Sequence, residues 1–249
     1  MKIAVCAANK VGEELSKFIV SQEHPIEFAI TCKNDSYEKK IYESFSSHHI
    51  PCYQSIDING EQFTALIKEK SLDIVFSLRR SNIVKDRVIK AANIGFVNLH
   101  PSFLPYNRGK HPYYWALIDG TPSGVSIHYI TSGIDDGAVI CQKLIDTDIT
   151  TTANILYENL LKEMVVLFKN NYDLIVSQSL ICQEQDEDES TFHLAKEIEK
   201  HSEIDLNKNY KAIDLLNIMR ARNFPNGPSS FFYLNDDKYY VNIQIKKAE

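Results

Sequence analysis

The sequence predicts an α/β protein with a mostly parallel mixed sheet, extended at its C-terminal end by a small helix and a β-hairpin. Three observations indicate this. Short apolar runs alternate with helical patterns over the first half of the chain. Later runs at 124–130 and 138–145 read as further strands, and residues 230–234 and 238–245 flank the turn residues 235–237 like a hairpin. A chain of 249 residues is long enough for one large core and a small appendage.

The first element is an apolar run over residues 2–8, followed by an expected turn at residues 9–12 and a helical pattern. This turn lacks the glycine fingerprint that NAD binding needs. Strands joined by helices require right-handed crossovers, which favour a parallel, Rossmann-like sheet covered on both faces. Further strands are expected at 27–32, around 52–53, at 72–78 and at 95–99, and helices at 37–48, 62–70 and 88–92.

The second half of the chain contains longer helical patterns. Short helices are expected at 113–117 and 210–222, and a long helix at 151–176. The acidic run at 184–189 predicts a solvated loop and a domain boundary. We therefore expect an N-terminal catalytic domain over residues 1–183, and a linker with a small C-terminal subdomain over 184–249. The long helix has apolar residues that we expect in the core: Ile155, Leu156, Leu160, Met164, Leu167 and Phe168.

Composition narrows the class of protein. The net charge of −6 argues against a nucleic-acid-binding surface, which usually carries a basic footprint. The sequence shows no signal peptide and no apolar run of about 18 residues, as a membrane span needs. Five cysteines, without a Cys-x-x-Cys pair, are typical of reduced thiols. We expect a cytoplasmic protein with neither nucleic acid nor membrane as partner, and no His or Cys pair has metal-ligand spacing.

Polar side chains stand at the ends of two predicted strands. Asn98 and His100 lie two positions apart, so they point to the same side of their strand. Asp135 and Asp136 follow the strand at 124–130. Strand ends are where open α/β sheets usually bind ligands. Each residue alone is commonly a turn residue, but an amide donor, an imidazole and a carboxylate together predict a catalytic site.

The motifs around these residues resemble the folate-dependent formyltransferase family. They are Asn-x-His-Pro-Ser-x-Leu-Pro at 98–105, Arg108-Gly109, Asp135-x-Gly137, and Arg-Ala-x-x-x-Pro at 220–225. The resemblance covers nearly the whole chain. It implies transfer of the formyl group of N10-formyltetrahydrofolate to an amine, and the lack of His or Cys pairs with metal-ligand spacing predicts a reaction without a metal. It also implies that Asn98 stabilises the developing negative charge, while His100 acts as acid and base with Asp135 as its partner.

The resemblance also implies binding residues. Asp136 rivals Asp135 as the partner of His100, and the Asp-x-Gly motif favours Asp135. Arg79 and Arg80 suit a diphosphate because guanidinium is a forked donor, although a solvated pair is the alternative. His111 is interpreted as a substrate-loop residue and His128 as a strand residue.

The expected folate contacts are Ser77, Leu78, Arg79, Ile83, Ile130, Gly133 and Asp135. The expected acceptor contacts are Lys10, Arg79, Tyr106, Asn107, Arg108, Gly109, Lys110 and Phe224.

The loop at 105–112 and the strand at 124–129 look most like the nucleotide-sugar branch of the family. A glycine- and serine-rich phosphate loop is missing at residues 9–12, and no room is left for a tRNA-binding barrel. We therefore expect dTDP-4-amino-4,6-dideoxyglucose as acceptor, as used in surface polysaccharides such as lipopolysaccharide O-antigen. The 3-amino isomer is the nearest rival, followed by glycinamide ribonucleotide and methionyl-tRNA.

A different class stays open, namely a non-catalytic Rossmann-like nucleotide-binding protein. It would explain the alternating strands and helices but not the grouping of Asn98, His100 and Asp135. The exposed edge of the C-terminal hairpin favours a homodimer.

Overall fold

The computed structural model describes the whole chain except residues 55, 80–82, 226 and 249. Arg80, one of the two arginines considered for a diphosphate, therefore lies outside the described residues. Contacts divide the chain into two compact units. The first is Met1–His100, Ser126–Gln142 and Lys162–Gln185, and the second is Pro101–Val125, Lys143–Leu161 and Asp186–Glu249. The division at residue 184 into two domains stays a prediction.

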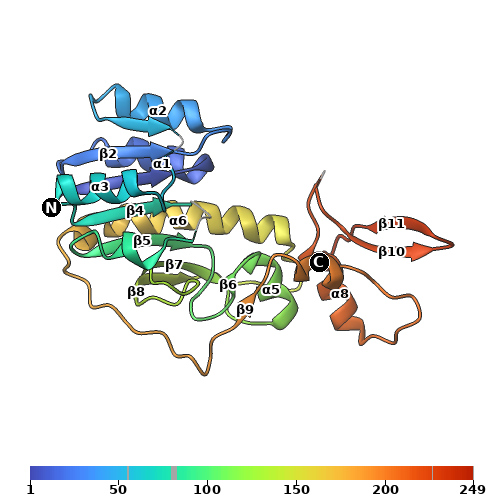
Figure 1. Cartoon of the computed structure of the whole chain (residues 1–249). Helices are drawn as coiled ribbons and strands as arrows, with labels where there is room; N and C mark the ends of the chain where they lie inside the picture. Colours follow the sequence, from blue (N-terminus) through green and yellow to red (C-terminus); the bar gives the residue numbers. More distant parts are fainter. Residues whose placement is uncertain (55, 80–82, 226, 249) are drawn as a thin grey trace. The chain divides into compact units, whose positions relative to one another are not determined.

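A seven-stranded mixed sheet confirms the predicted fold class (Figure 1). Its strand order is β3-β2-β1-β4-β5-β7-β8. The pairs from β3 to β5 are parallel, whereas β5 and β7 are antiparallel. The strands are β1 (Ile3–Ala7), β2 (Ile26–Thr31), β3 (Cys52–Gln54), β4 (Ile74–Leu78), β5 (Gly95–His100), β7 (Gly124–Tyr129) and β8 (Val139–Leu144).

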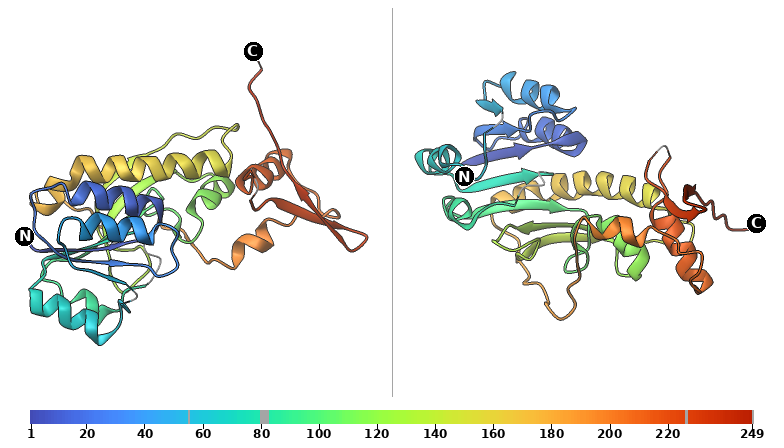
Figure 2. Two further views of the ribbon diagram at one scale, coloured as in Figure 1. Left: turned by 90° about the horizontal axis from the view of Figure 1, so that it is seen from above. Right: turned by 45° about the vertical axis from the view of Figure 1, so that its right-hand side comes forward.

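Helices cover both faces of the parallel part of this sheet, as the alternating sequence pattern predicts (Figure 2, left). Helices α1 (Asn9–Ile19) and α2 (Glu38–Ser46) pack against each other on one side. Helix α3 (Glu61–Lys70) covers the other side, where Phe63 lies edge-on between Phe28 and Phe96, with ring centroids 6.2 Å apart in both pairs. Strands β1 and β4 are therefore buried throughout, which explains their nearly continuous apolar sequence.

Two expected boundaries in this region are wrong. The sequence predicts a turn at residues 9–12, but α1 begins at Asn9, with only Ala8 between it and β1. The Asn9 side chain accepts a hydrogen bond from the Val11 N–H, and the Asn9 N–H donates to Asp35, so these polar contacts start the helix without a loop. Helix α4 covers only Asp86–Ile89 and does not reach residue 92.

The long helix α6 (Ala153–Val176) places most of its predicted core residues inside, since Leu156, Leu160 and Phe168 are completely buried. Ile155 is an exception, because it is 49% exposed. It directly precedes Leu156 and so turns about 100° away from it on a 3.6-residue helix. None of the helices in the described part of the chain could span a membrane.

The second unit contains the predicted helix and hairpin. Strands β10 (Ser230–Leu234) and β11 (Asp237–Val241) pair antiparallel, and Leu234 faces Asp237. Asn235 and Asp236 have φ angles of 50° and 68°, as a two-residue hairpin turn requires. Asp237, expected in the turn, therefore belongs to a strand. The other elements are α5 (Pro112–Asp119), α7 (Glu197–His201), α8 (Ala212–Ala221) and the short parallel pair β6 (Arg108–Gly109) and β9 (Phe192–His193).

Candidate active site

Strand β5 carries both Asn98 and His100, and the antiparallel register with β7 gives each a neighbour. Asn98 lies opposite His128, and His100 lies opposite Ser126. On its other side, Asn98 is the register partner of Ser77 in β4. Partners on neighbouring strands share a face of the sheet. The register therefore surrounds Asn98 with two polar residues that are distant in the sequence.

Asp135 reaches this group from the loop between β7 and β8. Because β7 is antiparallel to β5, the loop starts beside Phe96, whose carbonyl accepts the N–H of Ile130. The loop then turns back towards the C-terminal end of β5, since Asp135 Oδ2 lies 3.4 Å from His100 Nδ1. Both side chains are largely buried, so water weakens the contact between them little. The structure thus brings Asn98, His100 and Asp135 together.

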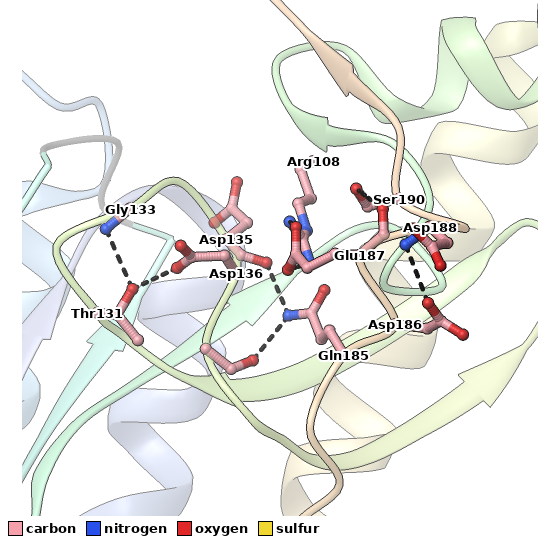
Figure 3. Close-up of polar contacts among 11 residues, drawn as sticks. Arg108, Thr131, Gly133, Asp135, Asp136, Gln185, Asp186, Glu187, Asp188 and Ser190 are labelled. Atoms are coloured by element: carbon pink, nitrogen blue, oxygen red, sulfur yellow. Dashed lines mark hydrogen bonds and ion pairs between the residues drawn. The ribbon is translucent and has the colours of Figure 1, made fainter.

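Asp136 points elsewhere. It accepts a hydrogen bond from the hydroxyl of Thr131, and that hydroxyl accepts the N–H of Gly133 at 3.1 Å (Figure 3). Asp136 therefore braces the loop, whereas the neighbouring Asp135 faces His100.

His128 joins the group, and sequence reasoning missed its part there. Its Nε2 lies 3.2 Å from the Nδ2 of Asn98 and 3.6 Å from Asp135 Oδ1. The alternation of the strand at 124–129 was visible in the sequence, but the pairing of His128 with Asn98 depends on the register between two strands thirty residues apart.

The hydrogen bonds of His128 assign its tautomer. Its Nδ1 lies 2.8 Å from the carbonyl oxygen of Tyr129, which can only accept, so Nδ1 carries the proton. Burial lowers the pKa of His128 to about 4, although the Asp135 carboxylate acts in the opposite direction. The ring is therefore neutral at pH 7, and its Nε2 lone pair accepts an N–H of Asn98. This contact fixes which end of the Asn98 amide presents donors.

We predict that His128 makes the protein less stable in acid. Because its pKa is about 4 in the folded chain and about 6.5 ordinarily, the unfolded chain takes up the proton first as the pH falls. The contribution of His128 to the free energy of unfolding is complete above pH 6.5. It is lost as the pH falls towards 4, at up to about 1.4 kcal/mol per pH unit. Denaturant unfolding across this range should give a shallower pH dependence for His128→Gln. Identical slopes in both proteins would contradict the assignment.

The other residues expected to contact folate lie near the ends of β4 and β7. Ser77 and Leu78 are buried in β4, and Arg79 follows with a φ of 64° while its carbonyl accepts from the Asn9 side chain. Ile83 is 59% exposed. Ile130 packs beside the core, and Gly133 lies in the Asp135 loop. A side chain at Gly133 would collide with the Asp136 carboxylate.

Lys10 is exposed in the first turn of α1. The other residues expected to bind the acceptor belong to the second unit, where several have protein partners. Tyr106 donates to Glu189, and Asn107 donates to Thr121 at 2.8 Å. Gly109 lies in β6, the Lys110 N–H donates to the His193 carbonyl, and Phe224 packs edge-on against Tyr113.

Arg108 forms a bidentate ion pair with Glu187. Its Nη1 and Nη2 lie 3.0 and 2.8 Å from the two carboxylate oxygens of Glu187 (Figure 3). Glu187 belongs to the acidic run that the sequence predicts as a solvated loop, so this partner was missed. The guanidinium lowers the pKa of Glu187 through this hydrogen bond. His111, expected in a substrate loop, directly precedes α5 and contacts the Tyr113 hydroxyl at 3.1 Å.

Among the residues that the structure describes, no group of three or more His, Cys, Asp or Glu side chains is arranged to hold a metal ion. The donor set around Asn98 fits a different ligand, a polar carbonyl group with an exchangeable proton nearby. An amide N–H can donate to a carbonyl oxygen, an imidazole can exchange a proton, and the carboxylate of Asp135 can orient the imidazole.

Comparison with known proteins identifies the family. Residues 15–169 match the family described as Formyl transferase, and residues 197–247 match the N-formyltransferase dimerization C-terminal domain. The chain is 29% identical over 252 residues to the bifunctional polymyxin resistance protein ArnA of Wigglesworthia glossinidia brevipalpis. That match covers 97% of this chain but only 37% of the relative, so the chain spans little more than a third of its length.

Two solved structures share the fold. A 4-N formyltransferase from Francisella tularensis is 23% identical, with a TM-score of 0.84 over 99% of this chain and 98% of that one. An N-formyltransferase from Helicobacter canadensis, in complex with folinic acid and dTDP-3-aminofucose, is also 23% identical, with a TM-score of 0.69 over 95% and 85%. The family match over residues 15–169 confirms the resemblance carried by the motifs around Asn98, His100 and Asp135, and the chain belongs to the formyl transferase family.

Proposed function

We propose that this chain transfers the formyl group of N10-formyltetrahydrofolate to the amine of a nucleotide-linked amino sugar. The observation that carries the proposal is the contact network of Asn98, His128, Asp135 and His100, which joins an oriented amide to an imidazole and a carboxylate. The family match and the folate-bound relative from Helicobacter canadensis support the formyl donor.

Bound formyltetrahydrofolate would supply the formyl carbon, to which the acceptor nitrogen bonds as the bond to N10 breaks, with one proton passing from the acceptor amine to N10. Asn98 donates an N–H to the formyl oxygen, where negative charge develops. Since the neutral ring of His128 accepts one N–H of Asn98, the second N–H is the one directed at the ligand.

His100 moves the proton. Its Nδ1 faces Asp135, so we assign the opposite nitrogen, Nε2, as the atom that takes a proton from the amine and returns it to N10. The carboxylate of Asp135 holds the ring in this orientation and stabilises the imidazolium that forms. Asp135 is thus a partner of His100 and does not itself exchange the proton.

The preferred acceptor is dTDP-4-amino-4,6-dideoxyglucose. It is supported by the sequence of the 105–112 loop and by the shared fold of the 4-N formyltransferase from Francisella tularensis. A dTDP-3-amino sugar is the second candidate, because the Helicobacter canadensis relative holds dTDP-3-aminofucose. Both acceptors present an amine to the same proton-transfer group, so the chemistry assigned to Asn98 and His100 serves either.

We also propose that the chain acts as a homodimer. The match of residues 197–247 to a dimerization domain supports this, and so do the large side chains that the hairpin exposes, Tyr233, Leu234, Tyr239 and Tyr240. Residues 1–183 would form the catalytic domain and 184–249 the linker and dimerization region.

The test is incubation of the purified chain with N10-formyltetrahydrofolate and a panel of dTDP-linked 3-amino and 4-amino sugars, glycinamide ribonucleotide and methionyl-tRNA. We expect release of tetrahydrofolate in equal amount with a formylated 4-amino sugar, detected by absorbance and mass spectrometry. Formylation of the 3-amino sugar alone would overturn the preferred acceptor. Silence with every amine, together with tight binding of NAD, would instead favour a non-catalytic nucleotide-binding protein.

A further inference from the structure

The loop that carries Asp135 is held in an unfavourable backbone conformation. Asp135 has a φ of 52°, in the left-handed region that a residue with a side chain seldom occupies. Such a conformation costs on the order of 1–3 kcal/mol and persists only where the surroundings enforce it. The orientation of the carboxylate towards His100 therefore depends on what holds this loop.

Contacts within the loop hold part of its backbone in place. Thr131 bonds to the Asp136 side chain and accepts the N–H of Gly133. Gly137 passes so close to Tyr129 that an added Cβ would lie 2.0 Å from the Tyr129 carbonyl oxygen. These contacts fix the two ends of the loop.

Gln185 holds the loop at Asp135 itself, from a distant part of the sequence. Its Nε2 donates to the carbonyl of Asp135 at 2.9 Å and to the carbonyl of Gly137 at 2.7 Å (Figure 3). A side-chain amide nitrogen has two N–H groups, and here the two carbonyls use both. The contact therefore fixes the backbone on each side of Asp136 with one group.

The segment that presents Gln185 is itself anchored. Two residues earlier, the backbone N–H and carbonyl of Gln183 pair with Val139 of β8, both at 2.8 Å. The side chain of Gln183, by contrast, is exposed. The pairing of Gln183 therefore holds the backbone beside Gln185 in place, and the half-buried side-chain amide of Gln185 contacts the loop.

Given the proposed formyl transfer, on which this inference rests, we propose that Gln185 is a positioning residue for the reaction. It acts through Asp135, by holding the loop so that the carboxylate stays against His100. Without the amide, the strained backbone at Asp135 relaxes and the carboxylate moves. A displacement of about 1 Å in such a site can lower a rate about 100-fold.

The experiment compares Gln185→Ala with Gln183→Ala, a matched substitution of the same residue type two positions away. We expect Gln185→Ala to lower kcat by about 10- to 100-fold, with each KM changed by less than about 3-fold, because a residue that acts through Asp135 affects the reacting groups and not the binding of either substrate. Gln183→Ala should behave like the wild type, since its side chain is exposed. Equal kcat values for the two variants would overturn the inference.

A second comparison separates positioning from a general loss of structure. In an Asp135→Asn background, Gln185→Ala should cause little further loss of kcat, since residues that act as one unit are not additive. A full additional loss in that background would show that Gln185 does not act through Asp135. A wild-type chain that formylates no acceptor would instead contradict the proposed function, independently of Gln185.

Discussion

Replacing His100 with glutamine is expected to lower kcat for formyl transfer by about 10³-fold, the largest effect of any single substitution. Glutamine keeps a hydrogen-bonding side chain of similar reach but cannot take up and release a proton, and proton transfer by a positioned group contributes about 10²- to 10⁴-fold. Folate affinity should change little, because His100 acts on the reacting atoms. Steady-state release of tetrahydrofolate and a separate folate-binding titration measure the two quantities.

His48→Gln is the matched control, because His48 is exposed near the end of α2. It should retain the wild-type kcat. If His100→Gln turned over within about 3-fold of this control, His100 could not be the group that moves the proton, and Asp135 would lose its role with it.

The Asn98→Ala substitution is expected to lower kcat by about 10²- to 10³-fold. Removing one donor aimed at a developing negative charge has this effect in other enzymes. Here the loss includes the contact with His128, whose Nε2 loses the N–H that it accepts at 3.2 Å. The same assay measures the change, and KM for folate should stay near the wild-type value, since the interaction strengthens only as charge develops.

Asn170→Ala serves as the control for this second substitution, because Asn170 is an exposed residue of α6 in the same unit. A raised KM with unchanged kcat for Asn98→Ala would contradict the predicted loss of kcat. It would mean that Asn98 binds the substrate in its ground state and does not stabilise the transition state.

The predictable part of the fold depends on local pattern. Strands such as β1 and β4 are short apolar runs between polar residues, and that is enough to locate them because both faces of the sheet are covered there. The sequence pattern also predicts the hairpin. The place of Asp237 in a strand follows from the turn type, which depends on the φ angles of Asn235 and Asp236. Helix starts were less predictable, since Asn9 replaces an expected turn with side-chain hydrogen bonds.

Strand periodicity predicts only the part of the site whose residues share a strand, and the Asp-x-Gly motif adds Asp135 as the partner of His100. Asn98 and His100 are two positions apart, so strand periodicity alone puts them on one side. The parts played by His128 and Gln185 were not predictable in this way, because they follow from the β5–β7 register and from a contact between residues 50 positions apart in the sequence. The ion pair of Arg108 with Glu187, 79 positions apart, is hidden for the same reason.

The most direct test of whether Asn98, His100 and Asp135 act on the formyl donor is a crystal structure of the chain with 5-formyltetrahydrofolate, a donor analogue. We expect the folate to bind with its N10 region within hydrogen-bond reach, about 3 Å, of the Asn98 amide and the His100 ring, while Asp135 stays on the opposite side of that ring. A folate bound elsewhere, or an N10 region separated from His100 by packed side chains, would contradict it.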